Sequence, residues 1–262
     1  MLLQGKRILV LGLMDPRSIA WQIGQAAAAH GAEVVYTCQR SRIARGFFRR
    51  AQAPLDETKL YELDVTDQAG VEQVLGEIGA PLHGLVYGPA YASPETCMGG
   101  RLDRAPVADV LQALQISVVG LAGICRVAVP LMQDGGSVIA LSFDSQHSYP
   151  AYNWMGVAKA ALEALVRGLQ RDYGPLGVRV NTISAGPQDT MASSHIPGFS
   201  QIAAIYPPRA PLGWDLRRGG ASVGDAAVFL LSDLSRSVGG AVLPVDGGAH
   251  AMGAPLLESA DE

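Results

Sequence analysis

Residues 6–24 read KRILVLGLMDPRSIAWQIG, and this stretch is the starting point for the fold of the whole chain. An apolar run of strand length, Ile8–Leu11, leads into Gly12, and a helix pattern begins at Ser18, which is expected to cap it. At such a junction, the free amides of the first helical turn form a site for the pyrophosphate of a dinucleotide. The G-x-G-x-x-G pattern is absent, so this segment alone is equally compatible with a tight turn between a strand and a helix.

Further apolar runs of strand length follow and alternate with segments of helix length. The runs are short and nearly continuous, as expected of strands covered by helices on both faces. The alternation predicts an α/β fold, a single doubly wound Rossmann-type domain over residues 1–262 with a seven-stranded parallel sheet flanked by helices. The expected strands are Ile8–Leu11, Glu33–Thr37, Leu60–Val65, Gly84–Tyr87, Ser137–Ser142, Arg179–Ser184 and Ala241–Val245.

The segments between these strands carry helix signals, and Thr66 is expected to cap one of them. Residues 188–220, rich in proline, glycine and small residues, have no clear place in the pattern. A loop of this length in a compact domain usually has a function. The expected helices are Ser18–His30, Thr66–Gly79, Asp103–Met132 with a break, Tyr152–Tyr173 and Ser222–Leu234.

The composition excludes several classes of protein. The 262 residues are 48% hydrophobic and 17% charged, the reverse of a disordered chain. A net charge of −4 argues against a nucleic-acid partner. No uninterrupted apolar run reaches the roughly 18 residues of a membrane span, and the start lacks a signal-peptide layout. Three scattered cysteines (Cys38, Cys97 and Cys125) and five histidines without metal-ligand spacing indicate no metal site and a cytoplasmic location.

The segment CQRSR at residues 38–42 bears on the adenosine half of a dinucleotide. A carboxylate that would hold the ribose hydroxyls at this point is absent. Gln39 can bind ribose hydroxyls through its amide, whereas Arg40 or Arg42 could meet a 2′-phosphate. The alternative is a solvated basic loop. The Asp64–Val65 pair after the third strand is suited to an adenine ring, since the carboxylate accepts from the exocyclic amine and valine covers the ring face.

The segment FDSQHSYPAYNWMGVAK, residues 143–159, follows a strand and enters a helix. Tyr152 and Lys159 are seven residues apart, which places them on roughly one helix face. A partly buried ammonium there can stabilise a tyrosinate or an enolate-like oxygen and can donate to ribose hydroxyls. The alternative is an amphipathic helix with a snorkelling lysine and a packed tyrosine.

Together these motifs resemble the short-chain dehydrogenase/reductase superfamily over nearly the full length. The matching segments are G-x5-S-I-A at Gly12–Ala20, Tyr-x6-Lys in YNWMGVAK, GVRVNTISAGP at Gly177–Pro187, and VDGG at Val245–Gly248. Classical members use Tyr-x3-Lys, but Met155 stands where that tyrosine would be. The chain is therefore similar to the NADH-dependent enoyl-[acyl-carrier-protein] reductases, and the segment from Phe143 is particularly similar to the mycobacterial form.

This resemblance implies NADH-dependent reduction of trans-2-enoyl thioesters in fatty acid biosynthesis. Tyr152 resembles the tyrosine that hydrogen-bonds the thioester carbonyl, and Lys159 the lysine that binds the nicotinamide ribose. Both are implied catalytic residues, and no metal is implied. The implied cofactor residues are Gly12, Ser18, Ile19, Gln39, Asp64, Val65, Gly88, Lys159, Gly186, Pro187 and Thr190. The implied substrate residues are Tyr91, Phe143, Tyr152, Met155 and Met191.

The resemblance also implies partners. The substrate would be an enoyl chain on acyl carrier protein, held by a substrate-binding loop at about residues 188–220, with 192–206 against the substrate. A homotetramer would pack segments 103–132 and 152–173 across a two-fold interface. NADH is favoured over NADPH, because members with glutamine at the position of Gln39 use NADH. No nucleic-acid or membrane partner is expected.

Several positions depart from the family pattern around the nicotinamide. Pro89 and Ala90 replace the usual Ile-Gly after the fourth strand, Gln188 and Asp189 replace Ile-Arg, and Met191 replaces leucine. Two other functions therefore stay open. One is a short-chain reductase acting on acyl-CoA or carbonyl substrates, and the other is a weakly active homologue that binds the cofactor and regulates.

Overall fold

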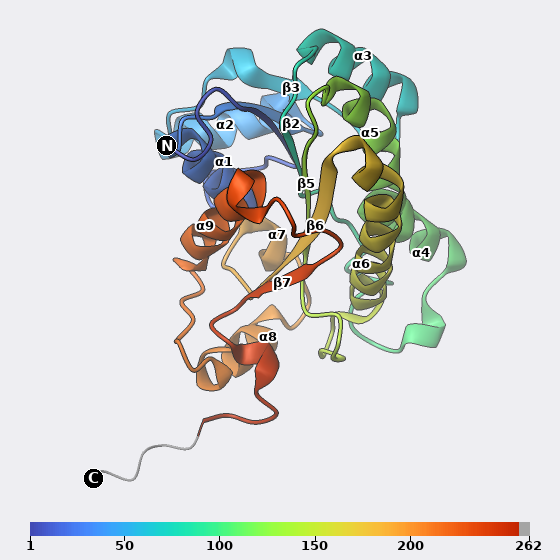
Figure 1. The fold of residues 1–262 in the computed structure, drawn as a ribbon. Helices are drawn as coiled ribbons and strands as arrows, with labels where there is room; N and C mark the ends of the chain where they lie inside the picture. Colours follow the sequence, from blue (N-terminus) through green and yellow to red (C-terminus); the bar gives the residue numbers. More distant parts are fainter. Residues whose placement is uncertain (257–262) are drawn as a thin grey trace, which may run out of the picture.

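A computed structural model of the chain describes residues 1–256, and a single parallel sheet forms its centre (Figure 1). In this part of the chain the sheet has seven strands in the order β3-β2-β1-β4-β5-β6-β7, which confirms the predicted Rossmann-type α/β fold. The strands are β1 (Arg7–Leu11), β2 (Glu33–Cys38), β3 (Leu60–Glu62), β4 (Gly84–Tyr87), β5 (Gly136–Ser142), β6 (Val178–Ala185) and β7 (Val242–Val245).

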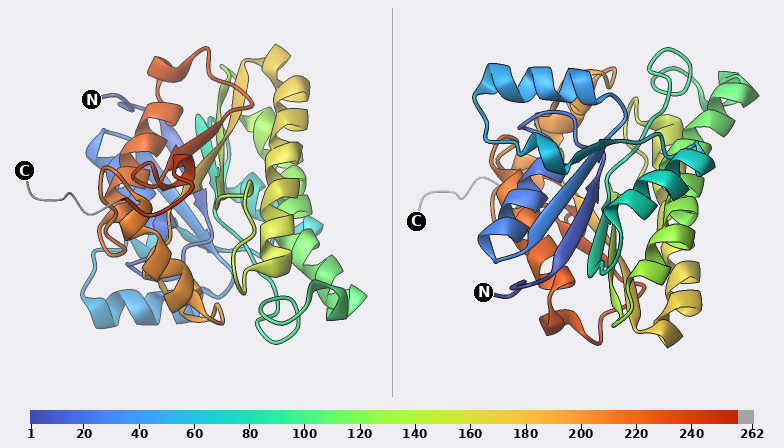
Figure 2. Two further views of the ribbon diagram at one scale, coloured as in Figure 1. Left: turned by 90° about the horizontal axis from the view of Figure 1, so that it is seen from below. Right: turned by 90° about the horizontal axis from the view of Figure 1, so that it is seen from above.

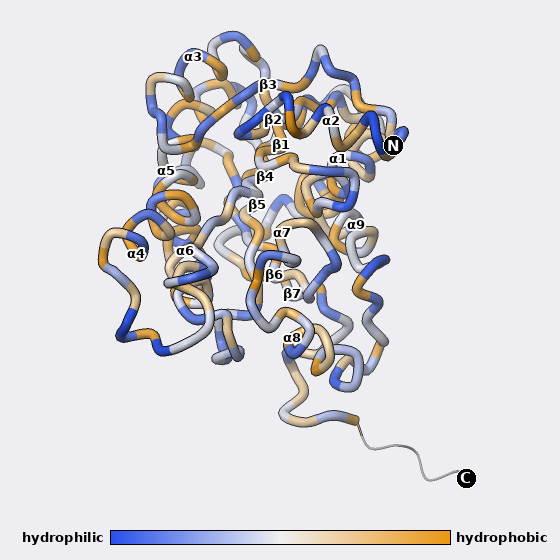
Figure 3. The backbone as a smooth tube through the Cα atoms, turned by 180° about the vertical axis from the view of Figure 1, so that it is seen from behind, coloured by the Kyte–Doolittle hydropathy of each residue, from blue (hydrophilic) through white to orange (hydrophobic). Residues whose placement is uncertain are grey.

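Two layers of helices enclose the sheet. Helices α1, α2 and α9 cover one face, and α3, α5 and α6 cover the other, with α4 preceding α5 (Figures 1 and 2). Hydrophobic residues concentrate on the central strands and hydrophilic ones on the outer segments (Figure 3). The larger helices are α1 (Ile19–Ala29), α2 (Ser41–Ala51), α3 (Gln68–Ile78), α4 (Val107–Leu114), α5 (Gly120–Ala128), α6 (Asn153–Tyr173) and α9 (Gly219–Leu231).

Strand β1 shows why its sequence is apolar throughout. Successive strand side chains point to opposite faces. Ile8 and Val10 pack in the core under α1 and α9, whereas Leu9 and Leu11 pack in the core under α3 and α5. β1 also pairs with β2 on one side and β4 on the other. The chain therefore changes direction across the sheet beside β1, and ligands of such sheets bind at the carboxyl ends of the strands there.

The ends of helices and strands show where local sequence patterns predict the boundaries correctly and where they do not. Ser18 caps α1 as predicted, because its side chain accepts from the Trp21 amide. Thr66 does not cap α3. The cap is Asp67, which accepts from the Gly70 amide, while Thr66 donates to Asp64. Strand β3 ends at Glu62, earlier than predicted, and the last large helix runs over Gly219–Leu231, three residues before the predicted segment.

Helix α2 was not predicted. Its sequence SRIARGFFRRA has a low mean hydropathy, and Arg40, at the N-cap position before the helix, gives no side-chain cap, so its local helix signals are weak. The helix is amphipathic, however, since Ala44 and Phe48 share its buried face. Phe48 packs edge-on against Trp21 of α1, with ring centres 4.7 Å apart. The sequence allowed residues 38–42 to lie in a solvated basic loop. In the structure, packing of Phe48 against Trp21 makes the segment from Ser41 onward a helix.

The predicted break in the long helix is a π-helical turn, Gln115–Val119, between α4 and α5. Among the described residues, Val107–Leu131 is a helix long and apolar enough to cross a membrane by length and composition alone, although polar residues interrupt its apolar run. Nearly half of its most apolar window is buried, with Leu121 and Ile124 in the core. Core helices of folded proteins pass the same test, so this finding is weak evidence for a membrane span.

Residues 188–220 contain local structure. Two short helices, α7 (Met191–Ser194) and α8 (Phe199–Ile205), precede a turn at Pro207–Arg209. Thr190 caps α7, accepting from the Ser193 amide at 3.1 Å. Helix α8 and the last described residues lie at the same end of the molecule (Figure 1), and nearby the Leu256 amide donates to the Pro208 carbonyl.

Candidate active site

A cleft of about 700 Å³ lies at the carboxyl ends of the strands. Its walls come from the turns after β1, β2, β4, β5 and β6, the start of α6, and the segment that carries α7 and α8. The predicted site residues that line it are Gly12, Ser18, Ile19, Gln39, Asp64, Val65, Gly88, Tyr91, Phe143, Tyr152, Met155, Lys159, Gly186, Pro187 and Thr190. Met191 does not line this cleft, although its neighbours Thr190 and Ala192 do.

The turn between β1 and α1 is compact because Gly12 permits it. Gly12 has φ +89°, and a Cβ there would lie 3.0 Å from the backbone of Gly88 and Pro89. The turn therefore fits closely against the one after β4. Beyond it, one carboxylate oxygen of Asp15 accepts from the Arg17 amide at 2.6 Å, while the other is buried without a partner within residues 1–256.

A second cleft residue also has a buried polar atom without a partner in the described chain. This atom is the amide nitrogen Nε2 of Gln188, a residue that the sequence marked as a departure. Both Gln188 and Asp15 line the cleft. Buried polar groups are nearly always hydrogen-bonded, so these two atoms, like four other buried side-chain atoms in residues 1–256, have an unmet capacity for a hydrogen bond.

Gln39 and Asp64 meet at the β2 and β3 end of the cleft. The Gln39 side-chain amide donates to Asp64 Oδ2 at 3.1 Å, and Thr66 donates twice to Asp64 Oδ1. The Thr66 hydrogen bonds, together with that from Gln39, lower the pKa of Asp64. Asp64 is therefore an ionised acceptor beside Val65, as required for the expected adenine pocket.

At the opposite end of the cleft, Tyr152 directly precedes α6 in an unusual backbone. Its neighbours Ala151 and Asn153 both have positive φ, +63° and +33°. The Asn153 side-chain amide donates to the carbonyls of Gly99 and Gly100, and so fixes this conformation. Strained backbone of this kind concentrates at functional sites. The residue pattern predicts a helix start at Tyr152 but carries no sign of the strained backbone around it.

Lys159 is buried with few partners. Its ammonium donates to the Leu141 carbonyl at 2.8 Å, and its side chain lines the cleft. Burial lowers the pKa of Lys159 to about 8, and the charge of Glu163 opposes that shift. Burial raises the pKa of Tyr152, so its phenol stays protonated at neutral pH. The tyrosinate that the sequence left open is therefore disfavoured, and the phenol is a hydrogen-bond donor.

Glu163 is a buried residue that the sequence analysis missed. It lies one helical turn after Lys159, and its carboxylate oxygens accept from Ser142 and Ser145, each at 2.6 Å. These contacts tie the end of β5 to α6. A buried glutamate four residues after a buried lysine was the available signal in the sequence.

Phe143 separates the Tyr152 end from an aromatic cluster. Its ring packs edge-on against Tyr149 and Tyr152, with ring centres 4.9 Å apart in both pairs, and it is tilted against Tyr206. The Tyr149 hydroxyl donates to the buried Asp144 at 2.7 Å. The adjoining cleft wall is apolar, and its residues include Met98, Met155, Ile196, Phe199 and Ile202.

Trp214 supports the turn after β6 and was also missed. Its indole nitrogen donates to the Pro187 carbonyl at 2.8 Å. A Cβ on Gly186 would come within 2.6 Å of the Trp214 ring. Gly186 is thus required by its packing against Trp214. Residue spacing alone gave no means of pairing positions 186 and 214.

Three remaining features need no ligand to explain them. Asp189 lies in the open between Arg17 and Arg217, each 3.9 Å away, so its charge is shared across the cleft edge. The cysteines are free and buried. Within the described residues, no group of three histidine, cysteine, aspartate or glutamate side chains is arranged to hold a metal ion.

Comparison with known proteins shows the family to which the chain is similar. The profile of a family described as "Enoyl-(Acyl carrier protein) reductase" matches residues 12–250. A protein of Rickettsia typhi named enoyl-[acyl-carrier-protein] reductase [NADH] FabI is 38% identical, with 98% of both chains covered. One of the same name from Bacillus cereus is 36% identical over 96% of this chain and 99% of its own. An enoyl-[acyl-carrier-protein] reductase [NADH] of Mycolicibacterium smegmatis is 35% identical over 95% of this chain and 97% of its own.

Proposed function

The chain belongs to the enoyl-(acyl carrier protein) reductase family, and on that basis we propose that it reduces trans-2-enoyl thioesters with NADH in fatty acid biosynthesis. The observation that carries this proposal is the placement of Tyr152 and Lys159. Both line one end of a cleft whose other end holds Gln39 and Asp64. A cleft that joins an adenine-type pocket to a tyrosine donor and a buried ammonium suits a dinucleotide and an activated carbonyl compound.

The residues of the cleft fit NADH. Asp64 and Val65 would hold adenine, Gln39 the adenosine ribose, and the first turn of α1 at Ser18–Ile19 the pyrophosphate. The rest of the dinucleotide, its nicotinamide half, would lie between the turns at Gly88, Gly186–Pro187 and Thr190. The orphaned atoms of Asp15 and Gln188 would gain partners from the ligand or its water. Bound NADH supplies the hydride that reaches the β-carbon of the enoyl thioester.

The chain's own contribution is placement and charge stabilisation. As the double bond is reduced, negative charge develops on the thioester oxygen. The neutral phenol of Tyr152 donates a hydrogen bond to that oxygen in a buried setting, where such a bond is strong. Lys159 holds the nicotinamide ribose and adds positive charge beside the oxygen. The α-carbon then takes its proton, ultimately from water.

The acyl chain would extend along the apolar wall. Tyr91, Phe143 and Met155 line the same cleft as Tyr152, and we assign them to the substrate. Residues 188–220 would act as the substrate-binding loop, with 192–206 against the acyl chain and Thr190 at its base. Residues 1–256 would form a single domain, and the last six residues of the predicted domain 1–262 lie outside the described part of the chain. The acyl group would arrive on acyl carrier protein.

An assay of NADH consumption tests this function. Purified protein with an enoyl-acyl carrier protein should oxidise NADH and form the saturated thioester, and crotonoyl-CoA should serve as a poorer substrate. Preference for the CoA thioester or for a ketone would replace the proposed substrate by the corresponding alternative. Tight NADH binding without turnover of any enoyl thioester would instead indicate a regulatory cofactor-binding protein, the role that the Pro89 and Gln188 departures left open.

For assembly we propose a homotetramer. Helix α4 and the π-helical turn after it expose Val107, Leu111 and Val119 by 59–73%, and Val157 on α6 is 42% exposed. An apolar face of this kind is a liability on a monomer and is suited to a second copy of the chain. Light scattering should give four times the chain mass, and Val119→Arg should lower it, whereas Leu176→Arg, equally exposed elsewhere, should not. A wild-type mass of one chain would exclude the tetramer.

The proposed compartment is the cytoplasm. The three free, buried cysteines suit a reducing environment, and the acidic net charge offers no basis for a nucleic-acid partner.

A further inference from the structure

The turn between β2 and α2 carries groups that favour a phosphate. NADPH differs from NADH by a phosphate on the 2′ position of the adenosine ribose. Arg40 supplies an exposed guanidinium, and Ser41, the first residue of α2, supplies an amide and a hydroxyl at a helix N-terminus. Taken alone, this set of donors would accept a 2′-phosphate.

In the structure a carboxylate already occupies the Ser41 donors. Glu62 Oε2, at the end of β3, accepts from the Ser41 amide at 2.9 Å and from the Ser41 hydroxyl at 2.7 Å. These hydrogen bonds lower the pKa of Glu62, so it is ionised at neutral pH. A phosphate that used the Ser41 donors would have to displace an anion already bound there.

The surroundings add further negative charge. A cavity of about 500 Å³ adjoins the cleft, and the two share Gln39, Arg40 and Asp64. Its remaining walls include the carboxylates of Glu62 and Asp67. Three carboxylates therefore border a space with one guanidinium. Arg40 makes no ion pair with the described part of the chain, and the Gln39 amide is bound to Asp64.

We propose that Glu62 is a specificity-determining residue that selects NADH over NADPH. It does so by holding the amide and hydroxyl of Ser41 and by placing a negative charge where the 2′-phosphate would bind. This inference rests on the proposed function, since it presupposes that Gln39 and Asp64 hold adenosine. It assigns cofactor choice to the end of β3, although the usual carboxylate position at the end of β2 is occupied by Gln39.

Equilibrium binding tests the proposal without turnover. Dissociation constants for NADH and NADPH would be measured by calorimetry on wild-type protein and on Glu62→Ala, Glu62→Gln and Asp67→Asn. Glu62→Ala should tighten NADPH binding by about tenfold or more and change NADH binding less than about twofold, because charge-assisted bonds to Ser41 become available. Glu62→Gln should give a smaller gain, since its carbonyl still accepts from Ser41. Arg40→Ala added to Glu62→Ala should remove the gain.

Asp67→Asn is the matched control, because Asp67 lines the same cavity but bonds the Gly70 amide instead of Ser41. It should change NADPH affinity far less than Glu62→Ala. Equal gains in both variants would make the effect one of general charge and overturn the role of Glu62, as would unchanged NADPH affinity in folded Glu62→Ala. Wild-type protein that binds both cofactors equally would also overturn it while leaving the reductase proposal intact. Failure to bind either cofactor would instead refute the proposed function.

Discussion

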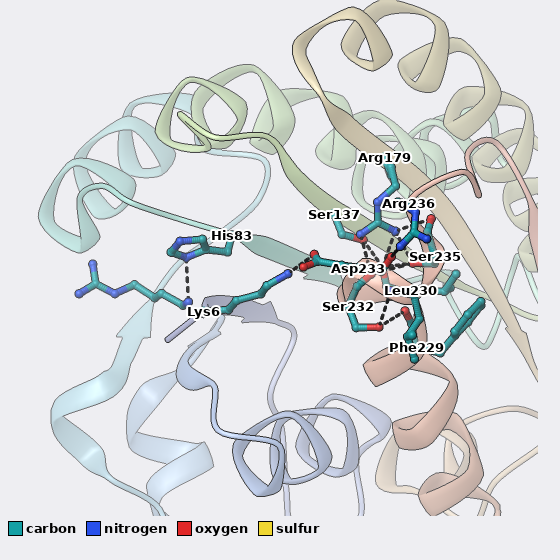
Figure 4. Close-up of polar contacts among 12 residues, drawn as sticks. Lys6, His83, Ser137, Arg179, Phe229, Leu230, Ser232, Asp233, Ser235 and Arg236 are labelled. Carbon is teal, nitrogen blue, oxygen red and sulfur yellow. Dashed lines mark hydrogen bonds and ion pairs between the residues drawn. The ribbon is translucent and has the colours of Figure 1, made fainter. Parts of the chain in front are cut away.

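The two ends of the sheet differ in how fully their charged side chains are hydrogen-bonded. At the amino end, Arg179 of β6 donates to the carbonyls of Leu230, Ser232 and Ser235 and to the Ser235 hydroxyl (Figure 4). These carbonyls lie at and just beyond the C-terminus of α9, where helical carbonyls lack partners. At the carboxyl end, Lys159 has one carbonyl partner, and buried atoms of Asp15 and Gln188 have none in the described chain.

This difference indicates that the charge of Arg179 supports the fold, whereas the charge of Lys159 is available to a ligand. The Arg179 guanidinium is directed at several carbonyls, so its role is complete within the fold. Ser137 adds to the same network by donating to the Leu230 carbonyl at 2.7 Å. Burial lowers the pKa of Lys159, and this residue lines the open cleft. This combination is typical of ligand-binding sites. The single carbonyl partner of the buried Lys159 and the cleft that this residue lines therefore mark the carboxyl end as the candidate active site.

The largest expected effect is on catalysis at the carboxyl end. Tyr152→Phe should lower turnover of an enoyl thioester by about 100- to 1,000-fold, the cost of losing one oxyanion donor. NADH affinity should stay nearly unchanged, as measured by fluorescence titration. Tyr149→Phe is the matched control, because its hydroxyl bonds Asp144 and does not reach the cleft. Equal losses in both variants would contradict the assigned role of Tyr152.

The next effect should appear at the amino end and in stability alone. Arg179→Met should lower the free energy of unfolding by about 2–4 kcal/mol, because the carbonyls of Leu230, Ser232 and Ser235 each lose one of their donors and the Ser235 hydroxyl loses its guanidinium partner. Turnover per folded molecule should stay unchanged. Arg236→Met, an exposed neighbour at the same helix end, should cost less than about 0.5 kcal/mol. Urea titrations measure both, and a loss of activity in folded Arg179→Met would break the contrast between the two ends.

A smaller effect concerns pH. The charged form of Lys159 donates the stronger hydrogen bonds to the cofactor, and burial lowers the pKa of this residue to about 8. NADH affinity should therefore fall as pH rises above about 8. Glu163→Gln removes a charge that supports the ammonium, so the fall should begin at a lower pH. Ser145→Ala is the control, since it removes one Glu163 partner and keeps the charge. An identical pH profile for wild-type and Glu163→Gln protein would refute this coupling.

NADH affinity should fall as pH rises, whereas the contribution of Lys159 to folding stability should increase. Unfolded Lys159 keeps its proton up to its ordinary pKa of 10.5, whereas the folded residue releases it near 8. The unfolded state therefore binds more protons between these values, and the Lys159 contribution to stability should rise with pH across this window. Comparing urea midpoints of wild-type protein and Lys159→Met over that range isolates this contribution.

Much of the fold was determined by the sequence alone. Apolar runs punctuated by glycine located the seven strands, and their alternation with helices predicted a parallel sheet. The Ser18 cap and the spacing of Tyr152 and Lys159 followed from local rules, because capping and helical periodicity depend on residues a few positions apart. The residue-by-residue resemblance then brought Gln39, Asp64 and Gly186 to one cleft, where the structure places them.

Only the tertiary structure determined the pairings between distant segments. Glu62 bonds Ser41, Trp214 packs on Gly186, and helix α2 forms because Phe48 packs against Trp21. No local pattern encodes these contacts, since each joins residues at least 21 positions apart in sequence. The pKa of Lys159 and the orphaned atoms of Asp15 and Gln188 likewise arise from burial by several elements at once. Residue types fix which chemistry is available, whereas the packed fold decides which groups are satisfied and which remain for a ligand.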